Sequence, residues 1–258
     1  MTTENLRDTS AGLTRRGLLK GAAFGVAAAA GISGSALAAP QKIKRVVTNG
    51  RINQSVCDWC FLGDCSPKPM TLDELCRVSA AMGIKSVELV KPEDWPTLKK
   101  HGLICALAGS HGFVEGFNDK KNHEMCIDKV KTAVDACAEA GFPTVITFSG
   151  FRNNIPDDVG LDNTVAGLKK VIGYAEKKKV KLCIEVLNSR VAVEMKGHPG
   201  YMGDTVEWCG EVCKRISSPS MTFLFDVYHI QVMQGDIITR LRKWHEYIGH
   251  YHTAGVPG

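Results

Sequence analysis

The sequence predicts an α/β protein built as a (β/α)₈ TIM-type barrel, and two observations support this prediction. After residue 50, short apolar runs rich in β-branched residues alternate with amphipathic stretches, which is typical of βα units around a parallel sheet. Glu185, Asp226 and His252 lie at or near the carboxyl ends of such runs, where barrel enzymes place their chemistry. An open nucleotide-binding sheet is less favoured, because no Gly-x-Gly-x-x-Gly follows the first run and no phosphate loop is present.

The strands and helices can be assigned in order along the chain. The expected strands are residues 52–56, 86–90, 104–108, 144–148, 181–187, 221–226 and 249–253. One helix is expected to begin at the capping residue Thr71, and others cover residues 122–140, 162–179, 204–216 and 236–247. A closed barrel needs a further helix, strand and helix, so residues 51–258 are expected to form an incomplete barrel whose first and seventh strands do not pair. The chain is then a fragment of a longer protein or a barrel with an open side.

Composition and charge narrow the class of protein. The 258 residues are 44% hydrophobic and 23% charged, which excludes a disordered or a fibrous chain. Residues 39–258 carry 28 Lys and Arg against 25 Asp and Glu, an excess too small and too dispersed to indicate a nucleic-acid partner. Nothing after residue 40 approaches the run of about 18 apolar residues that a membrane helix needs, so no stable membrane insertion is expected in the mature part.

The first 38 residues have the features of an export signal. Arg15 and Arg16 precede a weakly apolar stretch rich in Gly and Ala, and a small-residue site ends at Ala38. This pattern resembles a twin-arginine signal peptide, with cleavage before Ala39 and residues 39–50 as a linker. We therefore expect a periplasmic or secreted protein. The alternatives are a disordered N-terminus and an uncleaved membrane anchor.

Eight of the ten cysteines fall into two groups. Five lie in apolar helix or strand patterns and are expected to be buried: Cys105, Cys137, Cys183, Cys209 and Cys213. Cys57, Cys60 and Cys65 instead lie close together in the sequence. This spacing fits three interpretations: one local disulfide, a redox pair or half of a zinc site. No second Cys-x-x-Cys completes a four-thiolate zinc site, and the sequence leaves the disulfide open.

Two carboxylates and an imidazole on consecutive strands predict a metal site. Glu185 and Asp226 each interrupt an apolar strand, where a carboxylate is costly to bury unless it is paired or bound to a metal. On the next strand, His250 and His252 share one face. This oxygen-rich set suits Mn²⁺ or Mg²⁺, or Co²⁺, better than a thiolate-binding metal. Taken singly, each residue has an ordinary alternative as a loop contact or a satisfied core residue.

The segments around these residues resemble one known family. They are Glu185-Val186-Leu187-Asn188, Phe225-Asp226-Val227-Tyr228-His229-Ile230-Gln231 and residues 248–258. They are similar to the xylose isomerase-like barrel superfamily, and most to its hydroxypyruvate isomerase-like branch. The resemblance implies a divalent metal held by Glu185, Asp226, His252 and a Glu on an eighth strand, which has no counterpart in this sequence. It also implies that a hydroxypyruvate isomerase carries Gln at position 252, so His252 points toward the related ketose epimerases.

This resemblance implies a metal-dependent isomerase of small hydroxy-carbonyl or sugar substrates. A proton would move next to a carbonyl through a metal-stabilised enediolate, with Glu185 as the catalytic acid/base. His229 would hydrogen-bond a substrate hydroxyl, and four weaker substrate-binding candidates are Asn188, Arg190, His111 and Trp59. The alternatives are a ketose 3-epimerase, a keto-sugar lyase and a sugar-binding barrel with impaired catalysis. A metal-dependent endonuclease is disfavoured by the small charge. Open strand edges would favour a homo-oligomer.

Overall fold

The computed structural model describes residues 43–63, 66–194 and 196–256. The expected signal peptide, the first part of the linker and Cys65 therefore lie outside the described residues. Within the described part of the chain, no helix is both long and apolar enough to cross a membrane.

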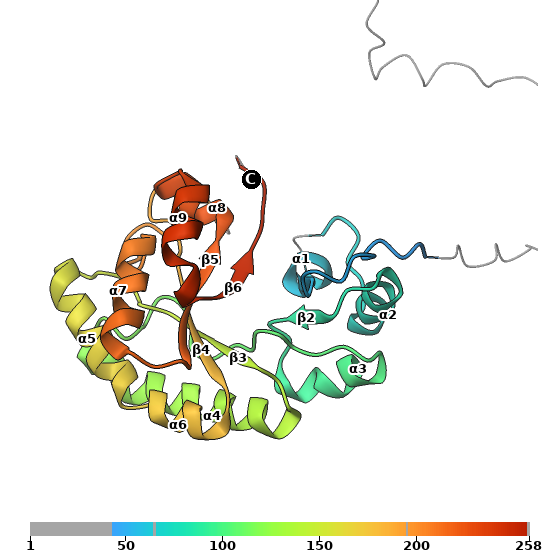
Figure 1. Cartoon of the computed structure of the whole chain (residues 1–258), viewed down its shortest axis with the longest axis horizontal. Helices are drawn as coiled ribbons and strands as arrows, with labels where there is room; N and C mark the ends of the chain where they lie inside the picture. Colours follow the sequence, from blue (N-terminus) through green and yellow to red (C-terminus); the bar gives the residue numbers. More distant parts are fainter. Residues whose placement is uncertain (1–42, 64–65, 195, 257–258) are drawn as a thin grey trace, which may run out of the picture. The chain divides into compact units, whose positions relative to one another are not determined.

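Parallel strands form the centre of the fold, as predicted (Figure 1). They are β1 (Ser55–Cys57), β2 (Ser86–Glu88), β3 (Thr144–Thr147), β4 (Lys181–Glu185), β5 (Met221–Asp226) and β6 (Ile248–His252). β1 pairs with β2, and the other four follow one another in the order β3-β4-β5-β6, with every pair parallel. Among the described strands β1 and β6 do not pair with each other, as expected for an incomplete barrel.

The predicted strand at residues 104–108 is reduced to two isolated bridges. Ile104 is bridged to Ser86 of β2, and Ala108 is bridged to Val145 of β3. The chain bends at positions 106 and 107, which interrupts the ladder between the bridges. This segment nevertheless links the two groups of strands, because backbone hydrogen bonds join it to β2 on one side and to β3 on the other.

The helices return the chain between the strands (Figure 1). They are α1 (Trp59–Leu62), α2 (Leu72–Met82), α3 (Trp95–Lys100), α4 (His123–Ala140), α5 (Asp157–Lys169), α6 (Ile172–Lys178), α7 (Val206–Ile216), α8 (Val227–Met233) and α9 (Ile237–Trp244). Thr71 caps α2 as predicted, in a capping box with Glu74. Gly141 ends α4 in the left-handed conformation, with φ of 75°.

The single helix predicted over residues 162–179 is wrong. The structure has α5 and α6 in its place, separated by a turn at Lys170 and Val171. Val171 in this turn is fully buried. The helix predicted over residues 236–247 is also shorter, because α9 gives way to a 3₁₀ turn at His245–Tyr247.

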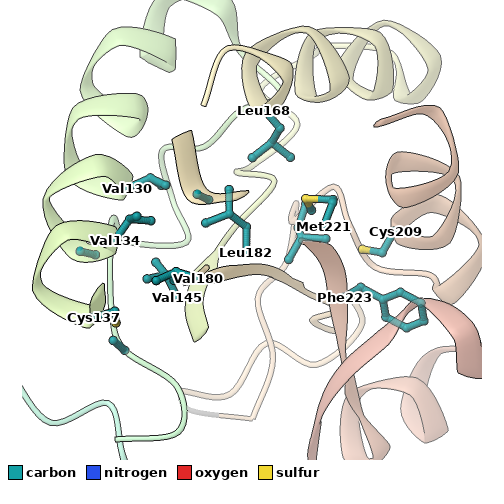
Figure 2. Close-up of a cluster of buried hydrophobic side chains, with 14 of the residues drawn as sticks. Val130, Val134, Cys137, Val145, Leu168, Val180, Leu182, Cys209, Met221 and Phe223 are labelled. Carbon is teal, nitrogen blue, oxygen red and sulfur yellow. The ribbon is translucent and has the colours of Figure 1, made fainter. Parts of the chain in front are cut away.

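The apolar core lies between the strands and the helices that cover them. Figure 2 shows side chains of α4, Val130 and Val134 among them, directed toward Val145 and Leu182 of the strands. The five cysteines predicted to be buried are at most 1% exposed. The core therefore fixes β3, β4 and β5 as a rigid support, and the polar residues at their carboxyl ends inherit defined positions.

Candidate metal and acid/base site

Chemistry-bearing side chains occupy the last residue of five described strands. They are Cys57 of β1, Glu88 of β2, Glu185 of β4, Asp226 of β5 and His252 of β6. Since the strands are parallel, these ends meet at one edge. Among them, Glu185, Asp226 and His252 each offer one ligand atom within 4.8 Å of the other two. The structure thus brings together the three residues that the sequence predicted as metal ligands.

The imidazole of His252 faces both carboxylates through Nδ1. This nitrogen lies 3.4 Å from Oε1 of Glu185 and 3.7 Å from Oδ2 of Asp226. Both carboxylates are nearly buried, at 8% and 7% exposure. No lysine or arginine of the described residues forms an ion pair with either carboxylate, so His252 is their main source of positive charge.

Burial leaves the charge on Asp226 poorly compensated. It raises the pKa of Asp226 to about 6, against the opposing hydrogen bond that the His229 N–H donates to its Oδ1 over 2.8 Å. The nearby charge of Glu185 raises the pKa of Asp226 further. Burial also disfavours the charged form of His252, but hydrogen bonds with Cys57, Glu185 and Glu88 outweigh it and raise the pKa of that imidazole well above its usual range.

These residues fit a divalent cation. Two buried carboxylates and one imidazole offer the oxygen and nitrogen donors that such ions take, and their separations allow one ion to contact all three. A cation would also add positive charge beside buried Asp226, whose pKa is raised by burial.

A second acidic group, missed in the sequence, lies on the other side of His252. Glu88 is 2% exposed, and its Oε2 accepts hydrogen bonds from Nε2 of both His250 and His252, each over 3.0 Å. Cys57 lies on the same side, with its Sγ 3.9 Å from Nε2 of His252. Glu88 interrupts an apolar strand just as Glu185 and Asp226 do, so the same signal was available.

One ring nitrogen of His229 is hydrogen-bonded within the protein. Its Nδ1 accepts the backbone N–H of Asn188 over 3.1 Å, and burial lowers the pKa of the ring to about 3, so the ring is neutral and its proton is on Nε2. No hydrogen bond among the described residues engages that nitrogen. His229 can therefore donate from Nε2 to a ligand.

Asn188 is occupied by the protein itself. Its amide donates to Lys196 O and lies 2.6 Å from Nδ1 of His229, while its Oδ1 accepts the N–H of Val191. These contacts close the loop after β4 and orient His229. The structure gives Asn188 a positioning role, and its predicted contact with substrate stays a prediction.

The other three weaker candidates differ in their surroundings. His111 is 4% exposed, with Nε2 on Thr147 Oγ1 and Nδ1 on two backbone carbonyls, so both ring nitrogens are already used within the protein. Arg190 is exposed and donates to the carbonyl of Val232. Trp59 is 39% exposed at the start of α1, directly after the end of β1. Substrate contacts by these residues remain predictions.

His198 is a further histidine near the site that the sequence did not single out. Its ring centroid is 4.3 Å from that of Phe113 and 6.0 Å from that of His229. Partial burial lowers the pKa of His198, so its ring is mostly neutral near pH 7. The residue lies in the irregular loop after β4, where no periodic pattern marks it.

Comparison with protein families gives one match over most of the chain. The model described as "Xylose isomerase-like TIM barrel" matches residues 76–258. Among curated proteins, the chain is 29% identical over 96 residues to a candidate hydroxypyruvate isomerase of Danio rerio, covering 37% of this chain and 33% of that protein. It is 31% identical over 83 residues to the 2-oxo-tetronate isomerase of Cupriavidus necator, covering 32% and 30%. These matches span about a third of each relative's length.

Solved structures share the fold at low identity. The D-psicose 3-epimerase of Clostridium cellulolyticum H10, solved with D-tagatose, superposes with a TM-score of 0.63 at 14% identity, covering 80% of this chain and 74% of the other. A protein named IOLI, solved with a bound zinc atom, superposes with a TM-score of 0.60 at 16% identity, covering 78% and 72%.

Proposed function

Because the chain belongs to the xylose isomerase-like TIM barrel family, we propose that it is a metal-dependent isomerase of small hydroxy-carbonyl or sugar substrates, similar to hydroxypyruvate isomerases. The observation that carries this proposal is the convergence of Glu185, Asp226 and His252 within 4.8 Å at the carboxyl ends of three adjacent strands. The isomerase names of the curated relatives support the same class of reaction.

Glu185, Asp226 and His252 would hold the cation. The donor set favours Mn²⁺ or Mg²⁺, with Co²⁺ as a further candidate, and the zinc in the IOLI structure supports a metal at this kind of site. Such a cation, when bound, polarises a substrate carbonyl and stabilises the negative charge that develops when a neighbouring proton is removed.

Glu185 is the proposed acid/base. Its Oε1 faces His252, while its Oε2 has no hydrogen-bond or ion-pair partner among the described residues and can take or return a proton. His229 donates from Nε2 to a substrate hydroxyl, with its ring orientation fixed by Asn188. The buried surroundings of both residues limit water, which strengthens these interactions.

The test measures proton transfer directly. The purified chain, stripped with a chelator and resupplied with Mn²⁺ or Mg²⁺, is incubated in D₂O with hydroxypyruvate and separately with ketoses. Isomerisation, or deuterium uptake next to the carbonyl, is followed by ¹H NMR. We expect both to depend on the added metal. Absence of exchange with every substrate, despite a bound ion, would contradict the proposal.

A ketose 3-epimerase is the second candidate, favoured by the imidazole of His252 in the cluster where a hydroxypyruvate isomerase is expected to carry Gln. The two reactions use the same first proton transfer and differ in where the proton returns. Inversion at C3 of a ketose without conversion to an aldose would identify an epimerase, whereas migration of the carbonyl would identify an isomerase.

We also propose export by the twin-arginine route, from Arg15 and Arg16 before the weakly apolar stretch. Replacement of both arginines by lysine should leave the precursor in the cytoplasm, as measured by cell fractionation. An unchanged appearance outside the cytoplasm would show that the protein uses another route.

A further inference from the structure

Glu88 accepts hydrogen bonds from two histidines at once. Its Oε2 lies 3.0 Å from Nε2 of His250 and 3.0 Å from Nε2 of His252, while its side chain is 3% exposed. The buried carboxylate of Glu88 is therefore placed to accept the Nε2–H of both rings.

A carboxylate oxygen that accepts from both rings requires a proton on Nε2 of each histidine. For His252 this has a consequence at the opposite ring nitrogen. A cation binds only a deprotonated ring nitrogen, and with the Nε2 proton donated to Glu88 that nitrogen is Nδ1, which faces Glu185 and Asp226 at 3.4 Å and 3.7 Å.

We propose that Glu88 is a positioning residue for the metal site and acts through His252. It holds the imidazole in the Nε2–H tautomer and in the orientation that presents Nδ1 to the ion. Metal-binding histidines commonly donate their other ring N–H to a carboxylate, and loss of that partner typically weakens metal binding by about 10–100-fold. This inference rests on the metal site of the proposed function.

Cys57 provides the competing arrangement. Cys57, Glu88 and His252 also offer ligand atoms within 4.8 Å of one another. An ion bound there would take Nε2 of His252 and would displace its hydrogen bond to Glu88. The two arrangements use opposite nitrogens of one ring, and a neutral ring has only one lone pair to give. An experiment can therefore tell them apart.

The test uses Co²⁺ as the probe, because its visible absorption reports the ligands around the ion. The metal-free chain is titrated with Co²⁺, and the dissociation constant is measured by competition with a chelator. The variants are Glu88→Ala and Glu88→Gln, with Glu211→Gln as a matched control at an exposed ion pair on α7. Melting temperatures without metal are measured in parallel.

We expect Glu88→Ala to weaken Co²⁺ binding by about 10–100-fold and to change the visible spectrum. Glu88→Gln keeps an acceptor oxygen but loses the charge. The affinity of this variant for Co²⁺ should be lower than that of the wild type by about threefold or more and higher than that of Glu88→Ala. The control should match the wild type. A purely structural role would lower the melting temperature without changing the spectrum or the affinity of the folded protein.

Three outcomes would overturn the inference. Wild-type affinity and spectrum in Glu88→Ala, or in Glu88→Gln if the alanine variant does not fold, would overturn it while leaving the metal site intact. A thiolate-to-cobalt charge-transfer band that is lost in Cys57→Ser would place the ion on the Nε2 side. Failure of the wild type to bind Co²⁺ would overturn the metal site of the proposed function and this inference with it.

Discussion

The two sides of His252 hold buried carboxylates whose pKa values move in opposite directions. Against the effect of burial, hydrogen bonds from two histidines lower the pKa of Glu88 at the end of β2 to about 2. Burial, with one opposing backbone N–H and the nearby charge of Glu185, raises the pKa of Asp226 at the end of β5 to about 6. Glu88 is paired with two imidazoles, whereas Asp226 has one imidazole nitrogen 3.7 Å away. This contrast supports placing the proposed ion on the Asp226 side of the ring.

The largest expected effect is a loss of activity on substitution of Glu185, on the same side of His252 as Asp226. Glu185→Gln keeps the shape of the side chain but removes the proposed base, so kcat for isomerisation should fall by about 10²-fold or more. Steady-state kinetics with saturating Mn²⁺ measures this. Retention of a tenth of the activity would show that Glu185 is not the base.

Metal-dependent stability tests the Asp226 side. In the wild type, Mn²⁺ at 100 times its dissociation constant should add about 2.7 kcal/mol to the free energy of unfolding. Asp226→Asn weakens the ligand set and should lose most of this gain, as measured by urea unfolding with and without Mn²⁺. An undiminished gain in the variant would remove Asp226 from the ligand set.

Without metal, substitutions of Glu88 and Asp226 should change the free energy of unfolding differently. Glu88→Gln removes a charge that accepts two hydrogen bonds and should lower the free energy of unfolding by about 1–3 kcal/mol. Asp226→Asn still accepts the N–H of His229 and relieves repulsion with Glu185, so the metal-free stability should stay equal or rise. Equal losses in both variants, in urea unfolding with a chelator present, would erase the contrast.

The smallest effect is a difference in pH dependence without metal. Between its ordinary value of 4.5 and about 2, Glu88 binds fewer protons in the folded than in the unfolded protein, so its contribution to stability is lost as pH falls through that window. Between 3.8 and about 6, Asp226 binds more protons in the folded protein, so stability falls as pH rises. Glu88→Gln and Asp226→Asn should each remove one of these slopes from a stability–pH curve. A curve unchanged by both substitutions would contradict the opposite pKa shifts.

Local sequence patterns predicted most strands and helices, because a buried strand or helix shows a regular spacing of apolar residues over a short stretch. They also predicted the acidic residues at the ends of β4 and β5. They could not predict that Glu88 meets His250, since these residues are 162 positions apart and only the closing of the strands brings them together. The same limit applies to His111, a weaker substrate-binding candidate whose Nε2 is engaged by Thr147, 36 positions away. The break between α5 and α6 was missed because buried Leu168, Val171 and Ala175 keep helical spacing across the turn, so the apolar pattern does not mark it.

The bent segment at residues 104–108 separates two hydrogen-bonded groups of strands whose ends share the site. Glu88 belongs to one group, and Glu185, Asp226 and His252 belong to the other. Isolated bridges and a few backbone hydrogen bonds, not a continuous ladder, join the two groups at this junction, so we expect it to open in hydrogen exchange more readily than the ladders within each group. An ion bound at Nδ1 of His252, whose Nε2–H donates to Glu88, would connect the two groups of strands and make such openings rarer. The amides of residues 104–108 would then exchange more slowly in the loaded protein, although none of them contacts the ion.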